Sequence, residues 1–260
     1  MTELAGFDLT KITYEGATRP MYRAGSGPGV VVIHEIPGIT PPVAEFARTL
    51  VAAGFTVFMP SLFGTPGKTK TTGYTISTIL RACVSKEFHC LALDKPSPIT
   101  TWLTALARDA HEELGGPGVG VVGMCLTGGF GLAMMLDPAV VAPVLSQPST
   151  PFAVSKQRKA SLGLNSEDWA RVEQKVADGC AVMGLRFTGD SNVPDERFAT
   201  LRDRLGDNFI AIEIDSSAGN QHGISTKAHS VLTQDLVDEP GHPTQEALAK
   251  TVEFLQARLA

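Results

Sequence analysis

One short segment constrains the fold more than any other part of the chain. Gly29–Ile33 reads GVVVI, a continuous β-branched run typical of a strand that is buried on both faces, as in a parallel sheet. Residues 43–53 follow with apolar side chains at helical spacing and end at Gly54, and residues 55–59 are again strand-like. A strand, a helix and a second strand with short connections predict a βαβ unit.

The same alternation continues to the C-terminus. We expect a weak hairpin at 9–23, further strands at 119–124, 140–145, 181–187 and 209–214, and helices at 98–114, 130–136, 166–176, 194–205 and 244–259. Ser166 is expected to cap its helix. Residues 61–97 lose the pattern apart from a helical piece at 76–81, which indicates a lid-like excursion. We predict a single α/β domain over 1–260, with a mostly parallel sheet and helices on both faces.

Composition and charge exclude several classes of protein. With 43% hydrophobic residues and a net charge of only −5, the chain is not expected to be disordered or to bind nucleic acid. Four cysteines without a CxxC spacing argue against a disulfide scaffold or a zinc ribbon, and we expect neither metal nor cofactor. No membrane span or secretory signal is recognisable, so a cytoplasmic protein acting on a small molecule is expected, with its oligomeric state left open.

The segment 123–129, GMCLTGG, is the most informative motif for function. An expected strand leads into it and an apolar helix leaves it, which is the context of a nucleophile elbow. The positive end of the following helix would stabilise a thiolate at Cys125 and an oxyanion beside it. The alternative is an inert cysteine buried in a glycine-rich corner.

A nucleophilic cysteine needs a base, and the base needs an orienting acid. In α/β-hydrolases the acid and then the histidine follow the nucleophile in the chain, and Asp190 and His229 satisfy that order. Asp190 also suits a turn that caps a helix, and His222 competes with His229 as the base. His34 precedes the nucleophile. The other histidines are read as solvated surface residues: His89, His111 and His242.

A nucleotide-binding alternative rests on residues 118–123, GVGVVG, which match G-x-G-x-x-G. The dinucleotide fingerprint belongs after a strand and at the start of a helix. Here the valines make the match part of a strand, and a long helix precedes it. A nucleotide-dependent oxidoreductase is therefore a minor alternative.

Four blocks together resemble the dienelactone hydrolase family of α/β-hydrolases. They are HEIPG at 34–38, the Cys125 elbow, GDSNVP at 189–194 and AHS at 228–230, and they occur in the family's order. The resemblance implies Cys125 as nucleophile, His229 as base and Asp190 as its orienting carboxylate. His229 is preferred to His222 because the family's histidine is followed by serine.

The resemblance also implies roles around the thiol. The family's glutamate at the position of Glu35 contacts the resting thiol, and its displacement by substrate releases a thiolate. A nearby carboxylate raises the pKa of a thiol and so protects it from oxidation. The backbone N–H groups of Ile36 and Leu126 would form the oxyanion hole.

Two departures from the family bear on turn geometry and substrate. Thr127 stands where the elbow usually has glycine, so a slightly wider turn is expected. The family's dienelactone-binding arginine four residues after the histidine is replaced here by Thr233, and Arg81 in the excursion is the remaining candidate for holding a substrate carboxylate. Dienelactone specificity is therefore in doubt, whereas the hydrolytic chemistry is not much affected.

The sequence thus predicts a cysteine-dependent hydrolase of an ester or lactone. Two other functions stay open. One is a broad carboxylesterase or thioesterase on the same fold, and the other is a catalytically silent α/β-hydrolase-fold protein that binds a small molecule or a partner.

Overall fold

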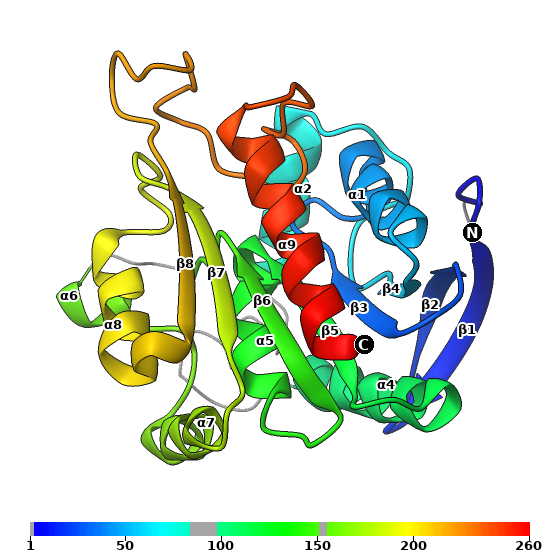
Figure 1. The fold of residues 1–260 in the computed structure, drawn as a ribbon. Helices are drawn as coiled ribbons and strands as arrows, with labels where there is room; N and C mark the ends of the chain where they lie inside the picture. The colour runs from blue at the N-terminus through cyan, green and yellow to red at the C-terminus, as the bar shows by residue number, and fades with distance from the viewer. Residues whose placement is uncertain (1–2, 84–97, 151–154) are drawn as a thin grey trace.

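A computed structural model describes residues 3–83, 98–150 and 155–260, with backbone alone for residues 81–83. Within this part of the chain, eight strands form one sheet in the order β1-β2-β4-β3-β5-β6-β7-β8 (Figure 1). The strands are β1 Asp8–Tyr14, β2 Ala17–Ala24, β3 Gly29–Ile33, β4 Thr56–Pro60, β5 Val119–Met124, β6 Val140–Ser146, β7 Val182–Phe187 and β8 Phe209–Ile214. The expected mostly parallel α/β sheet is confirmed, because β3 to β8 all pair in parallel.

The helices follow the expected alternation. They are α1 Pro41–Ala52, α2 Thr72–Cys83, α4 Pro98–Leu114, α5 Gly128–Met134, α6 Lys156–Ala160, α7 Ser166–Ala177, α8 Asp195–Leu205 and α9 Pro243–Leu259, with short 3₁₀ turns η1 Cys125–Thr127 and η2 Gly206–Asn208. α1 begins earlier than expected because proline is well tolerated in a first helical turn. The short helix α6 was not expected from the sequence.

One expectation about a helix end was wrong. Asn165, not Ser166, caps α7, and its side-chain oxygen accepts a hydrogen bond from Asp168 N at 2.9 Å. His242, expected as a solvated surface residue, is half-buried and caps α9, where its Nδ1 accepts from Thr244 N at 3.3 Å. Each capping side chain accepts a hydrogen bond from a backbone N–H group in the first turn, which has no acceptor within the helix.

The hairpin of β1 and β2 extends the sheet on the side of β4. Its turn residues Glu15 and Gly16 both have positive φ, at 50° and 74°, which suits the tight turns that match strand twist. Both strands are antiparallel to their neighbours. The weak hairpin expected at 9–23 is confirmed.

The alternation of side chains along β3 divides the core between the two faces of the sheet. Val31 and Ile33 belong to a cluster that includes residues of α4, α5, α7 and α8. Val30 and Val32 belong to a second cluster with residues of α1 and α9, and these two helices lie together on one face in Figure 1. Helices therefore cover both faces, as predicted for a parallel sheet.

The strand order places a topological switch point at β3 and β5. β3 lies between β4 and β5, so the chain leaves β3 toward one side and later continues from β5 toward the other. In open α/β sheets, ligands bind beyond the carboxyl ends of strands at such a switch point. The segments directly after β3 and β5 begin with His34 and Cys125.

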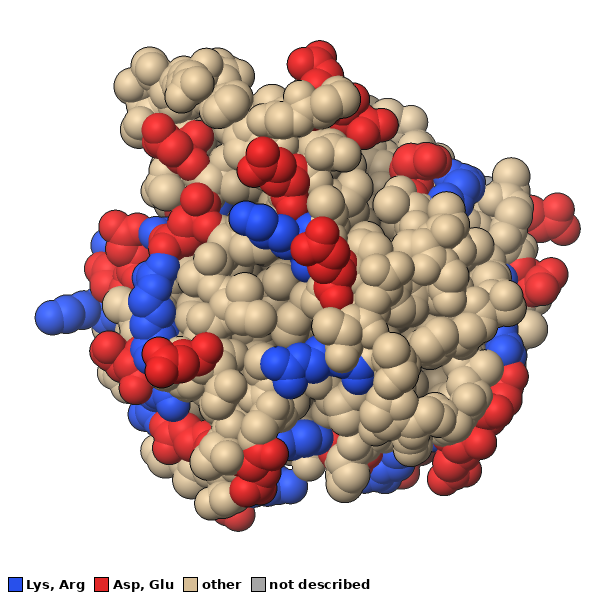
Figure 2. Space-filling view, viewed as in Figure 1, with Lys and Arg blue, Asp and Glu red and all other residues tan. Residues whose placement is uncertain are grey.

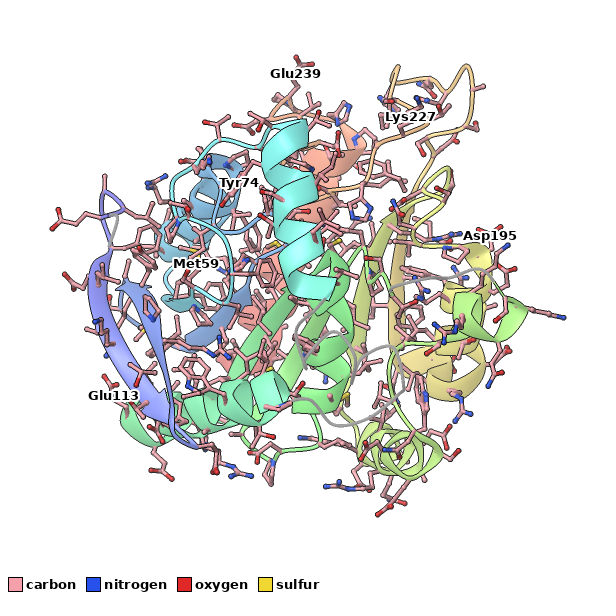
Figure 3. All side chains as sticks on the ribbon, turned by 180° about the vertical axis from the view of Figure 1, so that it is seen from behind. Met59, Tyr74, Glu113, Asp195, Lys227 and Glu239 are labelled. Carbon is pink, nitrogen blue, oxygen red and sulfur yellow. The ribbon has the colours of Figure 1, made fainter. Side chains whose placement is uncertain are left out.

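The excursion between β4 and α4 is described in part. α2 is longer than the expected helical piece, and the hydroxyl of Tyr74 accepts a hydrogen bond from Thr65 N. α2 lies toward the carboxyl ends of the strands (Figure 3). Residues 84–97 lie outside the described part of the chain, so a lid role for 61–97 stays a prediction.

Charged side chains are mixed on the outer surface. Figure 2 shows acidic and basic groups interspersed on the face that carries α9. Among the described helices, none is long and apolar enough to cross a membrane.

Candidate active site

The turn after β5 holds Cys125 in a strained backbone conformation. Cys125 has φ of 56°, a value that non-glycine residues rarely adopt. β5 runs into this turn and α5 leaves it, as the elbow motif predicts. Backbone strain of this kind is often found at functional sites. The surrounding structure must supply the contacts that hold it in place.

Thr127 connects the turn to the neighbouring strand through its side chain. Its Oγ1 accepts from Met124 N at 2.9 Å and donates to Ile33 O at 2.9 Å, which ties the end of β5 to the end of β3. Thr127 has right-handed backbone angles, with φ of −88°, so this position does not need glycine. Close packing requires glycine at 123 instead, where a Cβ would lie 2.4 Å from Thr127 O.

Asp190 and His229 meet beside Cys125. His229 Nδ1 lies 2.5 Å from Asp190 Oδ2, and the imidazole is also hydrogen-bonded to Cys125. Asp190 follows β7, and its second oxygen accepts from Asn192 N at 2.9 Å. The three side chains therefore converge at one edge of the sheet from positions 125, 190 and 229.

The pKa of His229 is raised well above its ordinary value. Burial by itself lowers it, but Cys125 and Asp190 together outweigh burial because each stabilises the imidazolium. The cationic form of His229 is therefore favoured in the folded protein. Its charge also stabilises the fold below pH 6.5, a contribution that is lost as the pH rises through the raised pKa.

The competing histidines occupy other places. His222 is exposed and its ring lies 5.6 Å from that of His242. His34 is fully buried: Leu62 N donates to its Nε2 at 3.0 Å, and its Nδ1 lies 3.0 Å from Glu35 O. Burial lowers the pKa of His34 to about 4, so it is a neutral structural histidine at neutral pH. Half-buried His111 is less solvated than expected.

Glu35 is held by the loop that carries His229. Its two carboxylate oxygens accept from Ser230 Oγ at 2.7 Å and from Thr233 Oγ1 at 2.5 Å. The side chain of Gln147 lies 3.5 Å from the same carboxylate. The sulfur of Cys125, in contrast, lies beside His229 and Ser149. Thr233, at the family's arginine position, thus contacts Glu35.

Ile36 and Leu126 follow Glu35 and Cys125 directly, one in each loop at the switch point. Their place at the two loops of the switch point is the one expected for oxyanion-hole donors, and this role stays a prediction. The backbone of Arg81 belongs to the last turn of α2, but its side chain lies outside the described residues, and its role stays a prediction.

The segment after β6 contributes residues that the sequence analysis did not select. Gln147 is fully buried with φ of 36°, and its Oε1 accepts from Val231 N at 3.3 Å. Ser149 Oγ lies 3.2 Å from Cys125 Sγ. The rule used for the other strands, polar residues directly after a strand end, also applies to this Ser-Gln-Pro-Ser run and would have found both.

Arg197 is a fully buried cation behind the site. Its guanidinium donates to Pro148 O, Asn192 O and Ser161 O, at 2.8 to 2.9 Å, and to Thr150 Oγ1 at 2.7 Å. Burial lowers its pKa to about 10, although Asp190, Glu196 and Cys125 act in the opposite direction. No sequence pattern distinguishes this arginine from others on amphipathic helices.

Asp235 shapes the loop of the candidate base. Its carboxylate accepts from the backbone N–H groups of His229 and Ser230, both at 2.9 Å. Among the described residues, no cluster of His, Cys, Asp or Glu is arranged to hold a metal ion.

A strained turn at the end of a central strand, in a mostly parallel sheet covered on both faces, defines an α/β-hydrolase. Residues 17–259 match the model of the dienelactone hydrolase family. The chain belongs to that family and is a hydrolase. No curated protein matches the sequence.

Solved structures share this fold at low sequence identity. A putative dienelactone hydrolase from Klebsiella pneumoniae is 16% identical with a TM-score of 0.65, over 96% of this chain and 98% of that one. The dienelactone hydrolase from Anabaena variabilis is 16% identical with a TM-score of 0.58, over 98% of both chains. A cold-adapted esterase from an Arctic intertidal metagenomic library is 17% identical with a TM-score of 0.59, over the full length of both.

Proposed function

We propose that this chain is a cysteine-dependent hydrolase of a carboxylic ester or lactone. The observation that carries the proposal is the convergence of Cys125, His229 and Asp190, with His229 hydrogen-bonded to both partners. Family membership supports hydrolysis of an ester, and the local geometry supports the thiol as the nucleophile.

In the proposed reaction the thiolate of Cys125 attacks the carbonyl carbon of the substrate. The N–H groups of Ile36 and Leu126 bind the oxyanion of the tetrahedral intermediate, and each such donor typically contributes about 10²–10³ in turnover. His229 then donates its proton to the leaving alcohol or enol oxygen. In the second half, neutral His229 accepts a proton from water, which attacks the thioester and releases the acid.

Asp190 keeps His229 in the orientation that this proton transfer requires. Its carboxylate fixes Nδ1, so that Nε2 is the nitrogen available to the sulfur and to the leaving group. We propose Glu35 as a further functional residue that acts through the His229 loop, because Ser230 and Thr233 both bind its carboxylate.

The natural substrate is proposed only as a class. Thr233 is bound to Glu35, and this favours substrates that do not need an arginine at that position to hold a second carboxylate. Broad carboxylesterase or thioesterase activity remains the second candidate, because the same groups act on any activated carbonyl of suitable size. A panel of p-nitrophenyl esters, a simple lactone, an enol-lactone and a thioester separates these possibilities.

The decisive experiment compares Cys125→Ala and His229→Asn with the matched variant His222→Asn. The first two are expected to lose at least about 10³-fold in kcat/KM on the best ester of the panel, because nucleophile or base is missing. His222→Asn is expected to keep wild-type kinetics because its exposed ring packs against His242, whereas His229 is the histidine bonded to Asp190. Iodoacetamide is expected to inactivate the wild type in step with alkylation of the Cys125 peptide. Full activity of Cys125→Ala would disprove the proposal.

A further inference from the structure

Ser149 is a hydroxyl-bearing residue in direct contact with the reacting sulfur. Its Oγ lies 3.2 Å from Cys125 Sγ, and its backbone N donates to Cys125 O at 2.9 Å. The side chain is almost completely buried, with 5% of the residue exposed. Two contacts from one residue thus join the segment after β6 to the turn after β5.

Arg197 forms hydrogen bonds with the residues on either side of Ser149 in the chain. Its guanidinium donates to Pro148 O at 2.9 Å and to Thr150 Oγ1 at 2.7 Å, the two neighbours of Ser149 in the chain. It also donates to Asn192 O at 2.8 Å, in the turn of Asp190. The hydroxyl of Ser149 is therefore fixed relative to both the thiol and the acid.

Whether the sulfur of Cys125 carries a proton decides which group, the thiol or the hydroxyl of Ser149, donates the hydrogen bond between them. A thiol carries one proton, and Cys125 is hydrogen-bonded to His229 as well as to Ser149. Once the proton is on His229, the sulfur only accepts hydrogen bonds. The hydroxyl of Ser149 must then donate to it, which a serine can do by rotation about its C–O bond.

We infer that Ser149 is a further catalytic residue, whose hydroxyl donates a hydrogen bond to the Cys125 thiolate and stabilises it before attack. This inference rests on the proposed function. It assigns to a neutral hydroxyl the contact with the sulfur that the family resemblance assigned to Glu35, whose carboxylate is bound here by Ser230 and Thr233.

The charged groups around Cys125 come from four elements. They are His229 in the loop after β8, Asp190 after β7 and Arg197 on α8, with Glu35 after β3 bound to the loop of His229. Ser149 is uncharged, so removing its hydroxyl changes hydrogen bonding to the sulfur but leaves the number of charges around it unchanged. An effect on the thiolate can therefore be assigned to the lost donor.

The test is the pH dependence of iodoacetamide alkylation at the Cys125 peptide, measured by mass spectrometry for the wild type and Ser149→Ala. The acid-side midpoint of the alkylation rate is expected to rise by about one pH unit, because a hydrogen bond to a charged acceptor is lost. Below the midpoint, alkylation is expected to be about three- to tenfold slower, because the thiolate fraction falls about tenfold and the nucleophilicity of each thiolate rises up to about threefold. On the alkaline plateau it is expected to equal the wild type or exceed it up to about threefold, since thiolate nucleophilicity rises with basicity.

The pair Ser149→Thr and Ser149→Val supports the test if the alanine variant folds poorly. These side chains have the same shape and differ in the hydroxyl, so the threonine variant is expected to keep the wild-type midpoint and the valine variant to show the shift. Exposed Ser217→Ala serves as the distant control. A merely structural role would lower the rate at every pH without moving the midpoint.

The outcomes separate the two proposals. An unchanged midpoint in folded Ser149→Ala, or equal midpoints in the threonine and valine variants, would overturn the role of Ser149 while wild-type inactivation by iodoacetamide keeps the proposed function intact. Alkylation of Cys125 without loss of ester hydrolysis would overturn the proposed function itself.

Discussion

At the scale of single residues, two buried histidines differ in pKa because they have different partners. His34 is buried between Leu62 N and Glu35 O, and its pKa is lowered to about 4. His229 is buried beside Cys125 and Asp190, and its pKa is raised. The same side chain is thus neutral at the end of β3 and favoured as a cation at the candidate site, because its partners differ.

The buried His34 predicts acid sensitivity of the fold. An unfolded chain protonates this histidine near pH 6.5, whereas the folded protein resists protonation down to about pH 4. The free energy of unfolding is therefore expected to fall by about 3 kcal/mol between pH 7 and pH 4 on account of this residue. His34→Gln keeps one donor and one acceptor but does not titrate. Urea unfolding at both pH values should show a smaller loss for the variant, and an equal loss would contradict the prediction.

At the scale of elements, the elbow between β5 and α5 depends on the close approach of two backbone segments. Thr127 O lies where a side chain at position 123 would begin, and Thr127 Oγ1 connects this turn to the end of β3. Position 123 and Thr127 flank Cys125 in the same turn. Any change that moves these two positions apart therefore also moves Cys125.

Gly123→Ala is therefore expected to displace Cys125, the proposed nucleophile. A Cβ at 2.4 Å from Thr127 O requires the backbone to shift, and a misplacement of about 1 Å typically costs about 10² in rate. We expect a loss of at least about 10²-fold in kcat/KM together with a lower Tm. Gly73→Ala in α2 is the control, because a Cβ there meets no other atom within 4 Å. Similar kinetics for the two variants would argue against this account of the elbow.

At the scale of the whole molecule, the site depends on segments that are far apart in the chain. Arg197 on α8 joins the loop after β6, the turn after β7 and Ser161 through carbonyl oxygens. Glu35 after β3 joins the loop after β8 through Ser230 and Thr233. These two groups connect five loops across the carboxyl edge of the sheet.

Arg197→Met is expected to lower the free energy of unfolding by about 3 kcal/mol or more, because buried carbonyls lose their donor. Arg197→Lys should be intermediate, since lysine keeps the charge but cannot reach all the acceptors. Arg204→Met on the same helix removes an exposed ion pair to Glu173 and is expected to cost about 1 kcal/mol or less. Urea unfolding of the three variants checks this order, and equal losses at 197 and 204 would refute it.

The regular elements were predictable because their signals are local. The GVVVI run, the helical spacing of residues 98–114 and the glycines at helix ends identified most strands and helices within a few residues. The cap of α7 was misplaced by one residue because Asn165 and Ser166 are both good capping residues. The elbow and the order of Cys125, Asp190 and His229 were also readable, since each follows a strand.

The sequence by itself determined a parallel α/β sheet, the family and the three residues that meet at its edge. Only the tertiary structure decided which groups complete the site. Ser149 and Gln147 could have been selected by their place after β6, and Arg197 lies on a helix that the sequence predicted, but their contacts were not predictable. Glu35 was placed against Ser230 and Thr233 by packing across nearly two hundred residues. Hydrogen bonds at such separations depend on how the loops fold over the sheet edge, and local sequence patterns do not encode that arrangement.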